Sequence, residues 1–138
     1  MLPQASSTAA DLTAPAGVAE LAGALRRAWG PDTCAPEDRS AWHPGNPARG
    51  QCITTVLVVH DHLGGELVRG EVHVDGERVD FHWWNRLPDG SEVDLTREQF
   101  ASHEIVSGGT TVARPADPGR VAPQYAVLVQ RLAELSAT

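Results

Sequence analysis

A short turn sequence, Asp-Gly at residues 75–76, is the feature that most constrains the fold of this 138-residue chain. It separates two segments with alternating side-chain character, residues 66–74 and 79–87. An Asp-Gly pair favours a tight two-residue hairpin turn, because both residues tolerate a positive φ. The chain is therefore expected to contain an antiparallel β-hairpin at its centre.

A second turn follows at residues 87–90, with the sequence LPDG. Its proline suits the first central position of a type I turn, and its glycine suits the left-handed position after it. Such a three-residue loop pairs Leu87 with Ser91, and continuing the register pairs Trp84 with Asp94. A third strand is therefore expected beside the hairpin.

Amphipathic periodicity predicts a helix near each end, over residues 14–28 and 123–135, with Thr13 as N-cap of the first. Residues 52–63, CITTVLVVHDHL, are ambiguous, because β-branched residues favour a strand while the length and the following Gly64-Gly65 favour a helix. A helix is predicted there, since a strand buried on both faces would not readily hold the polar residues at its end.

The remaining segments are assigned mainly from their composition. Residues 1–12 are predicted to form a mobile tail, and residues 13–138 a single α+β domain. The breaker-rich stretch 29–50 is expected to be an ordered irregular loop, and 107–122 a Gly- and Pro-rich loop. A short helix capped by Thr96 is expected between them.

Charge and cysteine content exclude several classes of protein. Eleven arginines and no lysine face 18 acidic residues, for a formal charge of −7, which argues against nucleic-acid or anionic-membrane partners. No apolar run approaches the length of a membrane span, and two cysteines cannot form a disulfide framework. The first fifteen residues lack the features of a signal peptide, so a cytoplasmic location is expected.

Three residues combine into a candidate catalytic triad: Cys52, His82 and Asp94. Cys52 lies at a predicted helix start, where unpaired N–H groups and the helix dipole are expected to lower the pKa of its thiol. His82 and Asp94 are diagonal neighbours on one face in the register derived above. We expect Cys52 to be the nucleophile, His82 the general base and then acid, and Asp94 the group that orients the imidazole.

The sequence resembles the YunG-like family of small bacterial proteins over about residues 29–101. The resemblance rests on a spaced set of matching residues, which are Trp42, Asn46-Pro47, Gly50-Gln51-Cys52, Thr55, Gly64-Gly65, His82, Trp84-Asn85, Gly90, Asp94-Leu95-Thr96 and Gln99-Phe100. The order Cys, His, Asp is also similar to that of papain-like and transglutaminase-like thiol enzymes. These resemblances imply an α+β fold with a papain-like or transglutaminase-like core, in which the cysteine helix packs on an antiparallel sheet. They also imply thiol acyl chemistry on an amide, ester or thioester.

Four further residues are candidates for substrate binding or support of the site. Gln51 and Asn46 are equally weak candidates for an oxyanion hole, because neither has the position of the upstream glutamine of papain-like enzymes. Trp84 and its neighbour Trp83 face opposite sides of their strand, so one of them is expected to wall a pocket. Asn85 is expected to support either the site or the turn.

The same residues also admit noncatalytic interpretations. In the purely structural alternative, Cys52 is an inert core thiol, His82 is a structural histidine and Asp94 is a helix cap. No Cys or His pair has metal-ligand spacing, so neither a metal nor another cofactor is expected. A disulfide between Cys34 and Cys52 remains open on count alone, and Gly108-Gly109 is interpreted as a flexible loop, with a lid as one option.

The sequence thus predicts a cysteine-dependent acyl-transfer enzyme. Because the chain is short, its substrate is expected to be a small molecule or a carrier-bound acyl group, with a partner protein completing the site as one option. Hydrolysis, transfer to an amine and cyclisation all remain open. The alternative is a noncatalytic binding or interaction module with the same fold.

Overall fold

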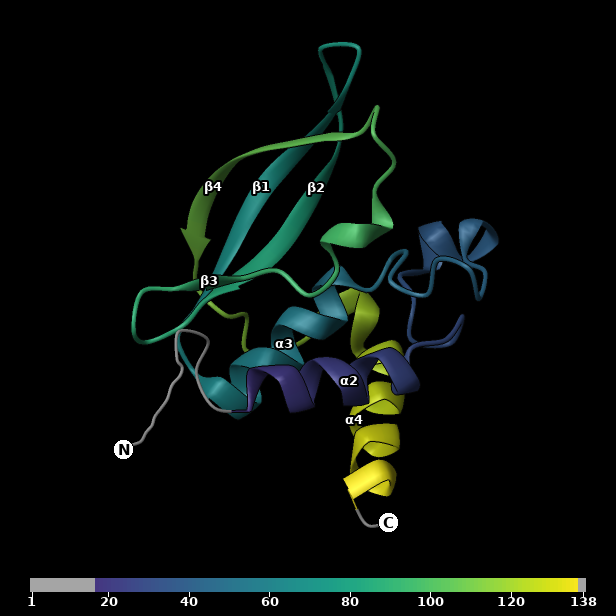
Figure 1. The fold of residues 1–138 in the computed structure, drawn as a ribbon, viewed down its shortest axis with the longest axis vertical. Coiled ribbons are helices and arrows are strands. Elements are labelled where there is room, and N and C mark those ends of the chain that lie inside the picture. Colours follow the sequence, from purple (N-terminus) through teal and green to yellow (C-terminus); the bar gives the residue numbers. More distant parts are fainter. Residues whose placement is uncertain (1–16, 137–138) are drawn as a thin grey trace.

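The structure, a computed structural model, describes residues 17–136. It is an α+β fold in which three helices gather on one side of a four-stranded sheet (Figure 1). The helices are α2 (Val18–Ala28), α3 (Cys52–Leu63) and α4 (Ala122–Ser136), and the strands are β1 (Glu66–Val74), β2 (Glu77–Arg86), β3 (Glu92–Val93) and β4 (Ile105–Val112). Three 3₁₀ helices complete it: η1 (Pro36–Ala41), η2 (Arg97–Gln99) and η3 (Gly119–Val121). The predicted tail 1–12 and the N-cap at Thr13 lie outside the described residues.

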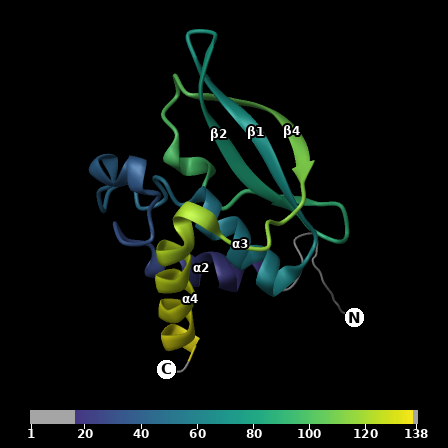
Figure 2. The ribbon, with the colours of Figure 1, turned by 180° about the vertical axis from the view of Figure 1, so that it is seen from behind.

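The two amphipathic helices confirm the periodicity read from the sequence. Leu25 of α2 and Leu128 of α4 are fully buried, and they share one apolar cluster with Val59 of α3. Figure 2 shows α4 extending away from the sheet, while α3 lies next to it. Helix α3 contacts both β2 and α4, so it is the layer through which helices and sheet are joined. No helix in residues 17–136 is long and apolar enough to cross a membrane.

Residues 52–63 form a helix, as predicted, despite their β-branched side chains. Every residue from Thr54 to Val59 is buried, so tertiary packing outweighs the modest cost of β-branching in a helix. The helix ends at Gly64, whose φ of 73° lies in the region that glycine adopts without strain. Gly65 also has a positive φ, of 88°, and the chain then enters β1.

The sheet has the order β3-β2-β1-β4 and is antiparallel throughout. The 75–76 turn joins β1 to β2 with φ values of 54° and 81°, which confirms the predicted hairpin. At the second turn the Leu87 N–H donates to the Ser91 carbonyl at 2.8 Å. Asn85 then pairs with Val93, so the register predicted from the turn is confirmed.

The loop predicted at residues 107–122 is wrong in its first part, because 105–112 form β4, which pairs with β1. Gly108 and Gly109 therefore lie in a strand and do not form a lid. A Cβ on Gly109 would lie 3.0 Å from the ring of Trp84, and one on Gly70 of β1 would lie 2.6 Å from it. At these two positions a glycine is needed because any side chain would collide with the tryptophan ring. In the sequence alone, glycines of this kind resemble those of a loop.

The short helix after Thr96 exists as η2, but Thr96 does not cap it through its side chain. Instead, the Thr96 N–H donates to Asp94 Oδ1 at 3.3 Å, and Gln99 Nε2 donates to the Thr96 carbonyl at 3.1 Å. The prediction that Thr96 caps this helix is therefore wrong. The Asp94 carboxylate, two positions earlier, accepts the hydrogen bond from the Thr96 N–H instead.

Candidate active site

Cys52 is the first residue of α3, where the chain leaves the irregular 29–50 loop. The preceding residue, Gln51, is fully buried, and its side chain fastens that loop: Nε2 donates to the Gly30 carbonyl at 3.0 Å, and Oε1 accepts from Thr33 Oγ1 at 2.8 Å. Gln51 is therefore committed to holding the loop against the start of α3. It fixes where Cys52 lies, and its amide is not turned to an incoming substrate.

The Cys52 side chain lines a cavity of about 270 Å³ between α3, β1, β2 and the η1 region. Its walls are formed by Ala35, Glu37, Asp38, Gly50, Cys52, Ile53, Arg69, Asp80, Phe81, Trp83 and Arg120. Of the adjacent tryptophans on β2, Trp83 lines this cavity and Trp84 does not. The volume suits a small group, and it is too small for an extended peptide.

Burial raises the pKa of the Cys52 thiol to about 12. A hydrogen bond from the Trp83 backbone N–H opposes the rise, whereas the negative charges of Asp80 and Asp94 add to it. The expectation of a lowered pKa at the helix start is therefore wrong for this structure, because loss of solvation outweighs the helix dipole. The resting thiol is neutral at physiological pH.

His82 faces the opposite side of β2 from Trp83 and is completely buried. Its Nε2 lies 2.7 Å from Asp94 Oδ2. The edge of the ring packs against Phe100, with centroids 4.7 Å apart, and Trp84 lies behind it at 5.7 Å. The other ring nitrogen, Nδ1, is buried and has no hydrogen-bond partner among residues 17–136. A buried nitrogen without a partner is costly, which makes it a candidate for a functional contact.

Asp94 is held by three donors. Oδ2 accepts from both His82 and Arg97 Nε, the latter at 2.6 Å, and Oδ1 accepts the Thr96 N–H. Burial opposes ionisation of Asp94, but the bonds and charges of His82 and Arg97 outweigh it, and the pKa of Asp94 lies below its usual value. The carboxylate is thus a fixed anion that orients the imidazole.

The Cys52 thiol contacts the backbone of β2 beside His82, whereas the imidazole faces the other side of the strand from Trp83. The Trp83 N–H that donates to the Cys52 sulfur belongs to the same peptide plane as the His82 carbonyl. Helix α3 is fastened to β2 three residues along the strand, where Asn85 Nδ2 donates to the Val56 carbonyl at 3.1 Å. Within residues 17–136 no hydrogen bond joins the thiol to the ring. The structure joins His82 to Asp94, and it places Cys52 at the start of α3 with no hydrogen bond to either of them among the described residues.

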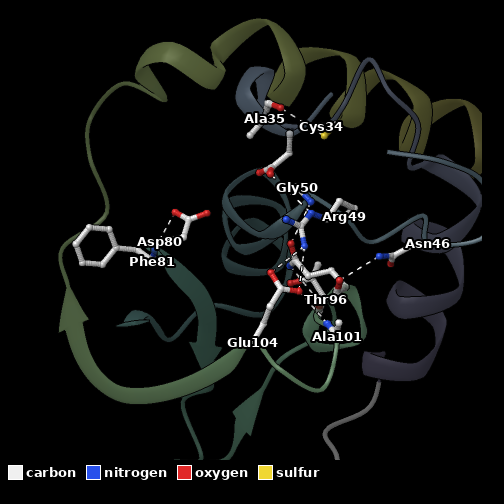
Figure 3. A network of polar contacts seen from close by, with 12 residues as sticks. Cys34, Ala35, Asn46, Arg49, Gly50, Asp80, Phe81, Thr96, Ala101 and Glu104 are labelled. Atoms are coloured by element: carbon white, nitrogen blue, oxygen red, sulfur yellow. Dashed lines mark hydrogen bonds and ion pairs between the residues drawn. The ribbon is translucent and has the colours of Figure 1, made fainter. Parts of the chain in front are cut away.

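The other predicted support residues have structural contacts. Asn46 Nδ2 donates to the Gln99 carbonyl at 3.0 Å, which ties the 29–50 loop to η2 within the polar network of Figure 3. Trp84 Nε1 donates to Glu92 Oε1 at 2.8 Å, and its ring fills the space left by the two glycines. Neither residue lines the Cys52 cavity.

Sequence reasoning missed two residues that act on the triad. Arg97 shares an Asp94 oxygen with His82, and its position three residues after Asp94 in a short helix is the only signal that could have indicated this. Asp80 lines the Cys52 cavity from the start of β2, which no local pattern indicates. Cys34 and Cys52 are both free thiols, and residues 17–136 contain no cluster of three or more His, Cys, Asp or Glu placed to hold a metal ion.

Comparison with known proteins identifies the family. The family model described as YunG protein matches residues 17–137. The "Uncharacterized protein YunG" of Bacillus subtilis (strain 168) is 36% identical over 61 residues, which cover 44% of this chain and 48% of that protein. The match thus spans about half the length of this curated relative. No solved structure matches the chain. Because the family model covers most of the sequence, including Cys52, His82 and Asp94, the chain belongs to the YunG family.

Proposed function

We propose that this protein is a cysteine-dependent acyl-transfer enzyme that acts on a small or carrier-bound amide, ester or thioester. The observation that carries the proposal is the state of His82: Asp94 holds Nε2 at 2.7 Å, while buried Nδ1 has no partner within the described residues. The imidazole is oriented by Asp94 and keeps one nitrogen free, and the next peptide N–H along β2 contacts the Cys52 thiol. These groups are the nucleophile, the base and the orienting residue that thiol catalysis requires.

The proposed reaction passes through a thioester on Cys52. The Cys52 sulfur attacks the acyl carbon while its proton passes to His82 Nδ1, and Asp94 stabilises the resulting imidazolium. The leaving group departs with that proton, which leaves a thioester on Cys52. Water, or an amine, then attacks the thioester with His82 as base, which releases the acyl product and restores the thiol. Asp94 touches no reacting atom and is a positioning residue.

The high pKa of Cys52 decides the form of this mechanism. A thiol with a pKa of about 12 does not rest as a thiolate, so the proton must leave during the attack itself. This differs from a preformed thiolate–imidazolium pair. The order of Cys52 at the start of a helix, His82 on a strand and Asp94 directly after the next strand supports the further proposal that the core is papain-like or transglutaminase-like.

The test is acyl-enzyme formation followed by intact mass. The protein is incubated with a panel of small acyl thioesters and glutamine-type amides, and an adduct is expected on Cys52. Cys52→Ala should abolish it, while His82→Ala and Asp94→Asn should slow it by about 10²–10⁴-fold. His103→Ala, which removes an exposed histidine outside the site, is the matched control and should leave the rate unchanged. Equal rates in the His82 and His103 variants would contradict the proposal.

A noncatalytic binding module is the second candidate, and the raised pKa of Cys52 is the observation that favours it. A neutral thiol in a small cavity can serve simply as part of a binding wall. The same panel separates the two functions. If no acyl donor leaves an adduct on Cys52, while small molecules still stabilise the fold against heat in a way that depends on residues of the cavity, the binding module is the better account.

A further inference from the structure

Two side chains meet the same oxygen atom of Asp94. His82 Nε2 lies 2.7 Å from Oδ2, and Arg97 Nε donates to Oδ2 at 2.6 Å. The other oxygen, Oδ1, accepts the Thr96 N–H at 3.3 Å. Because both nitrogens contact one atom, the guanidinium lies beside the imidazole, and the two groups compete for the same negative charge.

The short segment between Asp94 and Arg97 brings these side chains together. Asp94 directly follows β3, and Arg97 is the first residue of η2. Side chains three residues apart lie on the same side of a 3₁₀ turn. The Arg97 guanidinium also lies over the Trp84 ring, 5.5 Å from its centroid. The arginine is thus held at two points, by a carboxylate and by an aromatic face.

The three side chains form layers from the interior to the surface. The exposed fraction is 0% for the His82 side chain, 13% for Asp94 and 51% for Arg97. Among residues 17–136, Arg97 forms an ion pair with Asp94 alone. Its ring contact with Trp84 does not cancel its charge. A positive charge therefore acts on His82 across a single carboxylate, and water screens it only in part.

This arrangement separates two effects of Asp94 on the imidazole. A carboxylate beside an imidazole fixes the ring through the N–H bond, and it also stabilises the protonated ring. Arg97 weakens the second effect, because its charge balances that of Asp94 and repels a proton added to His82. The first effect remains, since a neutral imidazole can still donate Nε2–H to Oδ2.

Other charged or titratable groups near His82 leave this balance in place. Glu92 of β3 accepts from the indole of Trp84 at 2.8 Å and from Arg86 at 3.1 Å, so its charge is paired. The Cys52 thiol at the start of α3 is neutral at physiological pH. Asp94 and Arg97 are therefore the charges that decide whether the ring carries a proton.

We propose that Arg97 is a positioning residue of the acyl-transfer reaction, and that it keeps the His82 imidazole uncharged before substrate binds by sharing Asp94 Oδ2 with it. The inference deepens the proposed function and rests on it for the reaction. The charge of His82, in contrast, is a property of the resting protein. The proposed mechanism requires a neutral ring, because the Cys52 proton leaves during the attack and an imidazolium cannot accept it.

The first test follows the ring of His82 by proton NMR while the pH is varied from 5 to 9. Its Cε1–H signal is assigned by its absence from His82→Gln. In Arg97→Gln the pH midpoint of this signal should lie about 0.5–1.5 pH units above that of the wild type, because a repelling charge is lost. Arg97→Lys keeps the charge and should restore a midpoint close to that of the wild type.

Arg78→Gln is the matched control. Arg78 is likewise an exposed arginine that pairs with one carboxylate, Glu71, at 3.8 Å and lies over one aromatic ring, that of Phe81, at 4.7 Å. The variant removes the same charge away from Asp94, so the midpoint should remain that of the wild type. Equal midpoints in Arg97→Gln and the wild type overturn the proposal, as does a ring that stays uncharged in both. An equal rise in Arg78→Gln also overturns it.

The second test is the pH dependence of acyl-enzyme formation on Cys52. At a pH below both midpoints, Arg97→Gln should react about 3- to 30-fold more slowly than the wild type. Above both midpoints it should react at least as fast. A rate that falls by one factor at every pH would assign Arg97 a merely structural role and overturn the proposal.

Failure of the proposed function is a separate outcome. If no donor acylates Cys52, the enzyme is removed, while the NMR midpoints still decide whether Arg97 controls the charge of His82. If Cys52 is acylated but the midpoints do not differ, the enzyme stands and the role of Arg97 falls.

Discussion

At the scale of single residues, both thiols of the protein are held neutral by their surroundings. Burial raises the pKa of Cys34 to about 11, and nearby Asp38 adds to the rise. The pKa of Cys52 is raised to about 12. An unfolded thiol ionises near pH 8.5, so the folded state holds more protons than the unfolded state above that pH. The stabilisation is complete below about pH 8 and is lost as the pH rises toward the folded values.

This predicts a pH-dependent difference between the wild type and Cys52→Ala. The free energy of unfolding, measured by urea denaturation, should fall between pH 8 and pH 10, and the fall should be smaller in the variant by about 2 kcal/mol. Between pH 6 and pH 7, where neither thiol titrates, the two proteins should change in parallel. Parallel change up to pH 10 would mean that Cys52 ionises as an unperturbed thiol.

The second prediction at this scale concerns Gly70. A Cβ at this position would lie 2.6 Å from the Trp84 ring and 2.8 Å from the Ser107 carbonyl oxygen, so Gly70→Ala must displace a strand or the ring behind His82. Overpacking of this kind costs about 1–3 kcal/mol in unfolding free energy. Gly23→Ala is the control, because its Cβ would meet only the end of the Arg27 side chain at 3.7 Å and the alanine favours the helix. A neutral Gly70→Ala would show that the ring is free to move.

At the scale of elements, the turn at residues 87–90 sets the distance between His82 and Asp94. One glycine inserted into it should shift the register of β3 by one residue and turn Asp94 to the other face of the sheet. The hydrogen-bonded Nε2–H signal of His82 in the proton NMR spectrum should then disappear. The same insertion in the 75–76 turn should leave that signal in place. If the signal survives both insertions, the longer turn has absorbed the extra residue.

The sequence predicts a helix, strand or turn correctly where residues close together in the chain determine it. The two hairpin turns and the periodicity of α2 and α4 are local signals, and the pairing of His82 with Asp94 followed from one of those turns. Strand β4 was missed because its glycines are required by Trp84, a residue 25 positions earlier in the chain than Gly109. The Cys52 pKa was predicted in the wrong direction for a similar reason, since burial by distant segments decides it.

At the scale of the whole molecule, one apolar cluster joins α2, α3 and α4 and thereby supports the site. Leu128 is completely buried within it. Leu128→Ala should lower the free energy of unfolding by about 2–5 kcal/mol, as expected when a buried leucine leaves a cavity. Its neighbour Val129 is 42% exposed, so Val129→Ala should cost much less. Similar costs for both would mean that the outer face of α4 is covered in solution.

The adjacent tryptophans of β2 face two different compartments of the protein. Trp83 lines the Cys52 cavity, while Trp84 lies 5.7 Å from the His82 ring on the other face. An indole is a fluorophore, and a protonated imidazole quenches it. The strand that carries the proposed base therefore also carries two optical reporters, one for what enters the cavity and one for the charge on the imidazole. Replacing either tryptophan by phenylalanine would allow the two events to be observed separately in the same molecule.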